Sequence, residues 1–290
     1  MDPDSKLNEL IRAIYADDDA GAIAAIESGA NVNGDSRHGV RVLVHASHKG
    51  RVKVVNMLLD REASVNAHDA YESGGQTALI EASRQGHIDV VKLLLDRGAD
   101  VNATASGKYT PRHTALSRAS ENGHADIVKL LCSRGADVNA TDNGGKTALM
   151  WASENGHVDA VKALYDCGAD VNAVDIYGHT ALTLASQKSR SVDVVRVLSD
   201  LGSDVDRTTI FEGTALSMAG TKNIKKLLKS RGAYEYTWMP WGRNKTRKVQ
   251  VEEWPLLHNP SAGGGRRKYK NKRSHKTFKK FKRKSRKSRK

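Results

Sequence analysis

Histidine is the residue type whose spacing in this chain first raises the question of chemistry. His87, His124 and His157 each follow a glycine and are separated by 37 and 33 residues. Imidazole is a common metal ligand, but a structural zinc site needs about four Cys or His side chains close together. Because one histidine occupies the same turn of each sequence unit, we expect the three to lie apart and to make structural hydrogen bonds. The pattern predicts no metal and no cofactor.

Catalytic arrangements of other kinds are not apparent in the sequence. No glycine-rich phosphate loop after a strand, no nucleophile beside a general base and no paired carboxylates stand outside recurring positions. We therefore predict a protein that is not an enzyme and that has no catalytic residues and no small-molecule substrate. Cys132 and Cys167 are the only cysteines and occupy non-equivalent positions. They predict reduced thiols and a reducing compartment rather than a disulfide scaffold.

Two short words define a repeating unit. Gly-Ala-Asp-Val-Asn occupies residues 98–102, 135–139 and 168–172. Thr-Ala-Leu begins at five positions that are 37, 33, 33 and 34 residues apart, namely Thr77, Thr114, Thr147, Thr180 and Thr214. A period near 33 indicates one supersecondary unit that is copied and stacked, because two short helices cannot bury their apolar faces alone.

The unit that starts at Asp142 reads as turn, helix, turn, helix. Asp142-Asn143-Gly144-Gly145 is turn chemistry, and Thr147 is placed to cap the first helix with its hydroxyl. Asn155-Gly156-His157 ends that helix. Apolar residues at helical spacing from Val158 to Leu164 then predict a second helix, which Gly168 closes with a left-handed cap.

These units resemble the ankyrin repeat. The clearest copy has the motif residues of that family almost in order: Gly75, Thr77, Leu79, Ala82, Gly86-His87, Val90-Val91-Lys92-Leu93-Leu94-Leu95 and Gly98 to Asn102. Ala replaces the family's Pro after the Thr, at modest cost, and the following His is absent. The resemblance covers about residues 5–233. It implies an all-α solenoid of helix-turn-helix units with β-hairpin loops, which binds partners through hairpin tips and the inner-helix surface.

The resemblance divides the chain into four parts. We expect residues 5–33 to form an N-terminal capping repeat and 34–233 to form about six repeats, the last one shortened by three residues. The second repeat has Arg41-Val42-Leu43 in place of Thr-Ala-Leu, which predicts a weaker helix cap. Residues 234–262, with three of the four tryptophans, form a connector that either covers the last repeat or acts as a linear motif. Residues 263–290 are expected to be disordered.

Positive charge is concentrated in this tail. Residues 266–290 hold 16 of the 47 lysines and arginines and no acid, so the rest of the chain has 31 basic against 33 acidic residues. Such a run buries too little apolar surface to fold alone. Three uses stay open: a nuclear address, sequence-nonspecific RNA or DNA binding, and attraction to an anionic membrane surface. The tail residues assigned to targeting or nucleic acid are Arg266, Arg267, Lys268, Lys270, Lys272, Arg273, Lys279, Lys280, Lys282, Arg283, Lys284, Arg286 and Lys287.

The expected location follows from apolar patterning. The sequence has neither an apolar run near 18 residues nor an apolar N-terminal segment, so we expect a nuclear or cytoplasmic protein that is neither secreted nor transmembrane. Basic tails that begin with glycines also occur in large DNA viruses, and the chain is similar in style to the ankyrin proteins of such viruses. The location would then be in the host cell. We expect a monomer.

Positions that vary between repeats mark the expected partner surface. Framework positions repeat, whereas the fourth residue after the Thr and the pair before the Gly-His turn do not. Trp151 is the strongest candidate because Trp is enriched at binding hot spots, and inter-repeat packing is its alternative role. Glu81 and Arg118 are alternatively expected to pair across neighbouring repeats. The lengthened loop from Ala103 to His113 is a further contact or a tolerated insertion. The candidate residues are Arg84, Gln85, Glu121, Asn122, Trp151, Glu154, Asn155, Tyr177, His179, Gln187 and Lys188.

Asn102, Asn139 and Asn172 carry a further prediction. Each follows Asp-Val and lies eight residues after a leucine, which is similar to sites that an asparaginyl hydroxylase modifies in ankyrin repeats. The alternative role of each side chain is to satisfy hairpin backbone groups.

The favoured function is a non-catalytic protein-binding adaptor whose tail localises it, through a nuclear import receptor or through RNA or DNA. The alternative is a nucleic-acid-associated factor in which the tail is the primary binding element. The sequence does not identify the protein partner.

Overall fold

The structure, a computed structural model, describes residues 3–35, 41–70, 74–105, 112–188, 191–210 and 213–234. The polybasic tail, nearly all of the Trp-containing connector and part of the loop from Ala103 to His113 lie outside these residues. The described residues form fourteen α-helices and, beyond isolated bridges, no strand. The predicted all-α array of paired helices is therefore confirmed. The helices are α1 (Pro3–Tyr15), α2 (Asp19–Glu27), α3 (Val42–His48), α4 (Val52–Asp60), α5 (Ala78–Gln85), α6 (Ile88–Asp96), α7 (Ala115–Glu121), α8 (Ala125–Ser133), α9 (Ala148–Asn155), α10 (Val158–Asp166), α11 (Ala181–Lys188), α12 (Val192–Asp200), α13 (Ala215–Met218) and α14 (Lys222–Ser230).

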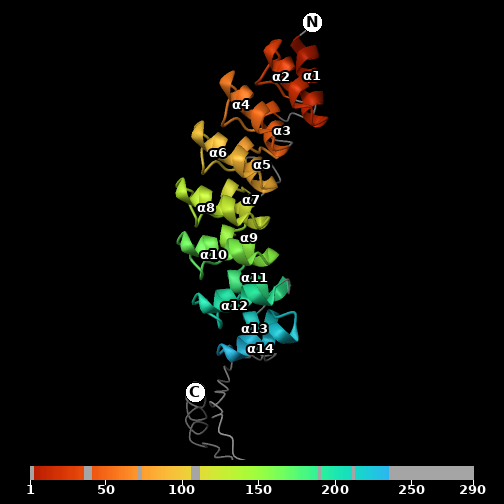
Figure 1. The fold of residues 1–290 in the computed structure, drawn as a ribbon. Coiled ribbons are helices and arrows are strands. Elements are labelled where there is room, and N and C mark those ends of the chain that lie inside the picture. Colours follow the sequence, from red (N-terminus) through yellow and green to blue (C-terminus); the bar gives the residue numbers. More distant parts are fainter. Residues whose placement is uncertain are drawn as a thin grey trace, which may run out of the picture. The chain divides into compact units, whose positions relative to one another are not determined.

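Consecutive helix pairs stack in sequence order. The odd-numbered helices contact one another in one row, here called the first row, and the even-numbered helices form a second row beside it (Figure 1). Between the rows lies a continuous apolar core. A leucine at the same place in six successive second-row helices is fully buried: Leu58, Leu94, Leu131, Leu164, Leu198 and Leu228. Each pair thus completes the core of its neighbour, as expected for a repeat array.

Threonine caps start the first-row helices as predicted. The Oγ1 atoms of Thr77, Thr147 and Thr214 accept from the backbone N–H groups of Ile80, Met150 and Ser217. Arg41, which stands at the cap of α3, makes no side-chain cap hydrogen bond, so its predicted weaker cap is confirmed.

Short hairpins connect the helix pairs. Antiparallel bridges between Asp35 and Arg41, Thr104 and Thr114, Thr141 and Thr147, and Thr208 and Thr214 close four of them. These bridges confirm the predicted hairpin loops. Each of these hairpins ends at the N-cap residue of the next first-row helix, which is a threonine in three cases and Arg41 in the fourth.

The recurring histidines make structural hydrogen bonds, as predicted, and these bonds join neighbouring repeats. The Nε2 atom of His87 lies 2.9 Å from the carbonyl oxygen of His48, and that of His157 lies 2.9 Å from the carbonyl of Glu121. His124 makes the equivalent contact with Arg84 at 3.1 Å. Each imidazole therefore satisfies a carbonyl group at the C-terminal end of the first-row helix in the preceding repeat.

The asparagines of the Asp-Val-Asn words form a second series of inter-repeat links. The amide of Asn139 accepts from the backbone N–H of Asp170 at 2.9 Å and donates to the carbonyl of Gly168 at 3.4 Å. Asn102 bridges to Asp137 and Gly135 in the same way. This geometry agrees with the backbone-satisfying role, and hydroxylation stays a prediction.

Asn139→Ala is expected to lower the free energy of unfolding by about 1–2 kcal/mol, because two hydrogen bonds between repeats are lost. Denaturant unfolding followed by circular dichroism measures the change. Asn143→Ala, at an exposed position of the next hairpin, is the control and should change stability by less than about 0.5 kcal/mol. Equal effects of the two substitutions would contradict the bridging role.

Candidate partner-binding surface

The predicted partner residues fall on the first row and on one hairpin. Arg84 and Gln85 end α5, Glu121 ends α7 with Asn122 directly after it, and Gln187 and Lys188 end α11. Trp151, Glu154 and Asn155 lie in α9, while Tyr177 and His179 lie on the hairpin before α11. All eleven are partly or fully exposed. Because α5, α7, α9 and α11 are successive neighbours in one row, the structure gathers these residues along one side of the array.

Trp151 is held in place from three directions. Its Nε1 donates to the Oδ2 atom of Asp142 at 3.2 Å. The Nζ of Lys146 lies 4.3 Å from the ring centroid, and the His113 ring lies 5.3 Å away. Trp151 thus packs against the preceding hairpin and keeps an exposed part. Its position combines a rigid aromatic surface with a fixed orientation, which lowers the entropy lost on binding.

Glu154 links two neighbouring repeats beside Trp151. Its carboxylate lies 2.6 Å from the Nζ of Lys146 and 3.4 Å from that of Lys188, which ends the next first-row helix. A carboxylate shared by two cations at a half-buried site is better fixed than an isolated surface ion pair. Trp151, Glu154, Lys146 and Lys188 are called the Trp151 cluster below.

The alternative prediction that Glu81 pairs with Arg118 is wrong. Glu81 lies 3.2 Å from Arg84 and 3.2 Å from His48, while Arg118 pairs with Glu121 at 2.9 Å. Partners one helical turn away compete successfully because residues three apart lie on the same helix face. Glu81 is also buried and does not face solvent as its variable position suggested.

His113 is a buried histidine behind Trp151. Its Nδ1 lies 3.4 Å from the hydroxyl oxygen of Ser117. Burial, together with the nearby positive charge of Arg118, lowers the pKa of His113 to about 4. The side chain is therefore neutral at physiological pH, and its imidazole packs against the indole in a tilted arrangement.

Two exposed isoleucines on hairpin tips were missed by sequence reasoning, although Tyr177 beside one of them was predicted. Ile176, Tyr177 and Ile210 are 58%, 52% and 62% exposed. The two tips are joined, because the Ile210 backbone N–H donates to the carbonyl of Tyr177 at 3.0 Å. The signal in the sequence was an isoleucine directly after the Asp or Thr that starts the turn. These three residues, called the apolar tips, extend the candidate surface beyond the helices.

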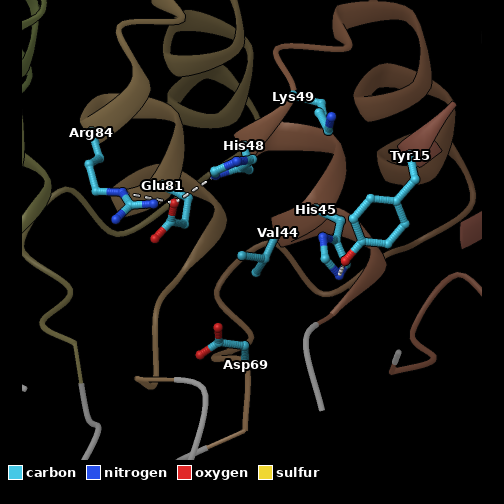
Figure 2. Close-up of a pocket in the computed structure, with 8 residues that line it drawn as sticks. All are labelled: Tyr15, Val44, His45, His48, Lys49, Asp69, Glu81 and Arg84. Carbon is cyan, nitrogen blue, oxygen red and sulfur yellow. Dashed lines mark hydrogen bonds and ion pairs between the residues drawn. The ribbon is translucent and has the colours of Figure 1, made fainter. Parts of the chain in front are cut away.

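A hollow of about 360 Å³ lies near the other end of the same row. Its lining comes from α1, α3, α5 and the hairpin between α4 and α5: Tyr15, Val44, His45, His48, Lys49, Asp69, Glu81 and Arg84 (Figure 2). The Tyr15 hydroxyl lies 3.0 Å from the Nε2 of His45. Among the predicted partner residues, Arg84 is the one that reaches this hollow.

Cys132 and Cys167 are free thiols. Burial, together with the neighbouring Cys167 side chain, raises the pKa of the Cys132 thiol to about 12. Cys132 is therefore protonated at physiological pH and a poor nucleophile. Both cysteines are partly buried, as predicted.

Family models for ankyrin repeats match most of the array. One matches residues 10–105 and 116–209, and a second matches residues 82–131. The chain belongs to the ankyrin repeat family. The crystal structure of the human ASB11 ankyrin repeat domain is similar, with a TM-score of 0.69 and 26% sequence identity, over 77% of this chain and 96% of that one. No curated protein sequence matched the chain.

Ankyrin repeat domains typically serve as scaffolds for protein–protein interaction, and the family is generally non-catalytic. In the described part of this ankyrin protein, no group of three or more His, Cys, Asp or Glu side chains is placed to hold a metal ion. Across the same residues, no helix has the length and apolar character needed to cross a bilayer.

Proposed function

We propose that this ankyrin protein is a non-catalytic adaptor that binds a protein partner along its first helix row. The observation that carries the proposal is the Trp151 cluster, where a partly exposed indole is fixed by Asp142 and flanked by ion pairs. The apolar tips next to this cluster supply further contact area. Large exposed apolar residues next to a fixed aromatic anchor are typical of interaction surfaces.

The proposal includes a localising role for the tail. Sixteen basic residues in 266–290 support an interaction with a nuclear import receptor or with RNA or DNA. Nuclear location and viral origin stay predictions that rest on this composition. The alternative function is a nucleic-acid-associated factor in which the tail binds first and the repeats recruit.

Affinity capture from cell extract separates the two functions. The full chain and a form ending at residue 262 are compared, each with and without nuclease, and bound proteins are identified by mass spectrometry. A protein partner retained by the shortened form and unaffected by nuclease supports the adaptor. Loss of every partner with the tail or with nuclease would instead establish the nucleic-acid-associated factor.

Trp151→Ala is expected to weaken binding of the captured partner at least tenfold, because truncating a hot-spot Trp costs about 2 kcal/mol or more of binding free energy. Isothermal titration calorimetry with the purified partner measures the change. Tyr165→Ala is the matched control, since Tyr165 is an exposed aromatic on α10 in the second row. Circular dichroism confirms that both variants are folded. A Tyr165 variant that loses as much affinity as the Trp151 variant would place the partner on the other face.

A further inference from the structure

Three hairpins of the array begin with an equivalent aspartate. In two of them, both carboxylate oxygens have partners within the chain. Asp142 accepts from the backbone N–H groups of Gly144 and Lys146 through Oδ1, and from the Trp151 indole through Oδ2. Asp175 accepts from two backbone groups of its own hairpin and lies 2.9 Å from the Nδ1 of His179. Each carboxylate thus has one backbone-facing oxygen and one side-chain donor.

Asp69, the third of these aspartates, has no such donor. Its Oδ1 accepts from the backbone N–H of Gln76 at 2.5 Å, and no side chain among the described residues donates to it. The residue at the position of Trp151 is Glu81, which has no proton to give when ionised. The residue at the position of His179 is Gln76, whose amide donates to the carbonyl of Gly74 instead. Asp69 is only 7% exposed, so water compensates little of this loss.

Asp69 lines the hollow between α1, α3 and α5 together with Glu81 (Figure 2). The basic side chains around the hollow contact carboxylates other than Asp69. Arg84 and His48 lie 3.2 Å from Glu81, and Lys49 lies 3.8 Å from Asp17. Among the described residues, Asp69 is therefore the carboxylate of this hollow that forms no ion pair, and the adjacent His68 influences it less than burial does.

A buried carboxylate that forms no ion pair is costly in its ionised form. Burial, and to a smaller extent the charge of Glu81, raises the pKa of Asp69 to about 6. A positive charge that enters the hollow would remove this cost and add a charge-assisted hydrogen bond, which is roughly twice as strong as a neutral one.

We propose that the hollow binds an arginine or lysine side chain of a partner protein, with Asp69 as its anion and Tyr15 and His45 as its aromatic wall. The volume of about 360 Å³ falls at the lower end of small-ligand pockets, which suits one side chain. A cation fits better than a neutral donor, because Asp69 and Glu81 are both acidic and the nearby cations are already paired. The Tyr15 ring adds cation–π attraction. This inference rests on the proposed scaffold function and names a chemical class that the first row recognises.

The test uses the full chain and a blocked arginine, N-acetyl-arginine amide, as the probe. Blocked citrulline has nearly the same shape without the charge and is the ligand control. Carboxyl and aromatic resonances report binding by nuclear magnetic resonance titration. Arginine is expected to shift the Asp69 carboxyl and the Tyr15 ring, and citrulline to bind at least tenfold more weakly. Equal binding of the two probes, or arginine shifts confined to other regions, would overturn the proposal.

Two variants test the role of Asp69. Asp69→Asn keeps an acceptor for the Gln76 N–H and removes the charge, so arginine binding should fall at least tenfold. Glu81→Trp introduces an indole at the position from which Trp151 donates to Asp142. It is expected to fill the hollow and abolish arginine binding while the fold is kept. Asp89→Asn, at an exposed position on α6, is the control and should bind as the unaltered chain does. Unchanged arginine binding in the Asp69 variant would rule out Asp69 as the anion of the site.

These outcomes are independent of the test at Trp151. If arginine binds as expected while the Trp151 variant keeps full partner affinity, the placement of the partner at the Trp151 cluster fails and the cation pocket stands. If the Trp151 variant loses its partner while arginine does not bind, only the pocket fails.

Discussion

Gly123→Ala is expected to lower the free energy of unfolding by about 3 kcal/mol or more, as overpacking and a left-handed backbone penalty add together. Gly123 has a φ of +79°, and a Cβ at this position would lie 2.6 Å from the Nδ1 of His157. The imidazole of the next repeat therefore rests directly on the glycine. Because the same ring is bonded to the carbonyl of Glu121 at 2.9 Å, it cannot move away without losing that hydrogen bond.

Gly135→Ala is the matched control. Gly135 has nearly the same φ, +84°, but a Cβ there would meet nothing within 4 Å. The control therefore measures the backbone penalty alone, about 1–2 kcal/mol. Denaturant unfolding of both variants, followed by circular dichroism at several protein concentrations, gives the difference. If Gly135→Ala proves as harmful as Gly123→Ala, contact between the glycine and the histidine contributes nothing.

A double substitution isolates the contact further. In a chain that carries His157→Ala, adding Gly123→Ala should cost no more than Gly135→Ala does, because the ring that the Cβ would strike is gone. The coupling energy between the two positions is then expected to be about 2 kcal/mol, within the range for residues in contact. The same arrangement recurs at Gly50 with His87 and at Gly86 with His124, so each junction of this type holds two repeats together.

The sequence predicted the local structure of this array well. Thr77 and Thr147 cap helices, and Gly98 and Gly168 take left-handed backbone angles of +84° and +91°. Such features depend on residues a few positions apart, so each repeat carries the information for them. Periodicity also predicted stacking, because a helix pair of this length cannot bury its own apolar face.

Contacts between repeats were harder to predict. The words Gly86-His87 and Gly123-His124 place glycine and histidine side by side in sequence, yet the histidine contacts the glycine of the preceding repeat. A repeated word gives the period but not which copies touch. The ion pairs of Glu81 failed as a prediction for a related reason, since several partners lay within reach and side-chain rotamers decided among them.

The candidate surface was predicted only in outline. Variable positions led to Trp151 and Glu154, but not to the Asp142 hydrogen bond or the Lys146 contact that fixes the indole. The open carboxylate of Asp69 was missed because the aspartates look alike when they are read alone. The difference lies in the first-row helix that follows each aspartate, where Trp151 follows Asp142 and Glu81 follows Asp69. Only the structure shows that this position lies within hydrogen-bond reach of the aspartate.

Acid is expected to destabilise the centre of the array through His113. Its imidazole protonates near pH 6.5 in the unfolded chain but only near pH 4 in the folded one. Between these values the unfolded state binds more protons, so stability falls as the pH falls, by at most about 3 kcal/mol. His113→Gln removes this group. Relative to that variant, the unaltered chain should lose stability steadily from pH 6.5 to pH 4, and a pH-independent difference would contradict the buried neutral state.

Asp69 is expected to act in the opposite direction over almost the same range. Its pKa is raised to about 6, so the folded chain holds the extra proton and stability rises as the pH falls from 6 towards 4. The two groups therefore partly cancel in the unaltered chain, and its overall pH profile hides both. Only comparison with His113→Gln and with Asp69→Asn separates them, because the two differences must have slopes of opposite sign. Their separation along the array also means that a cation in the hollow should flatten the Asp69 slope and leave the His113 slope unchanged.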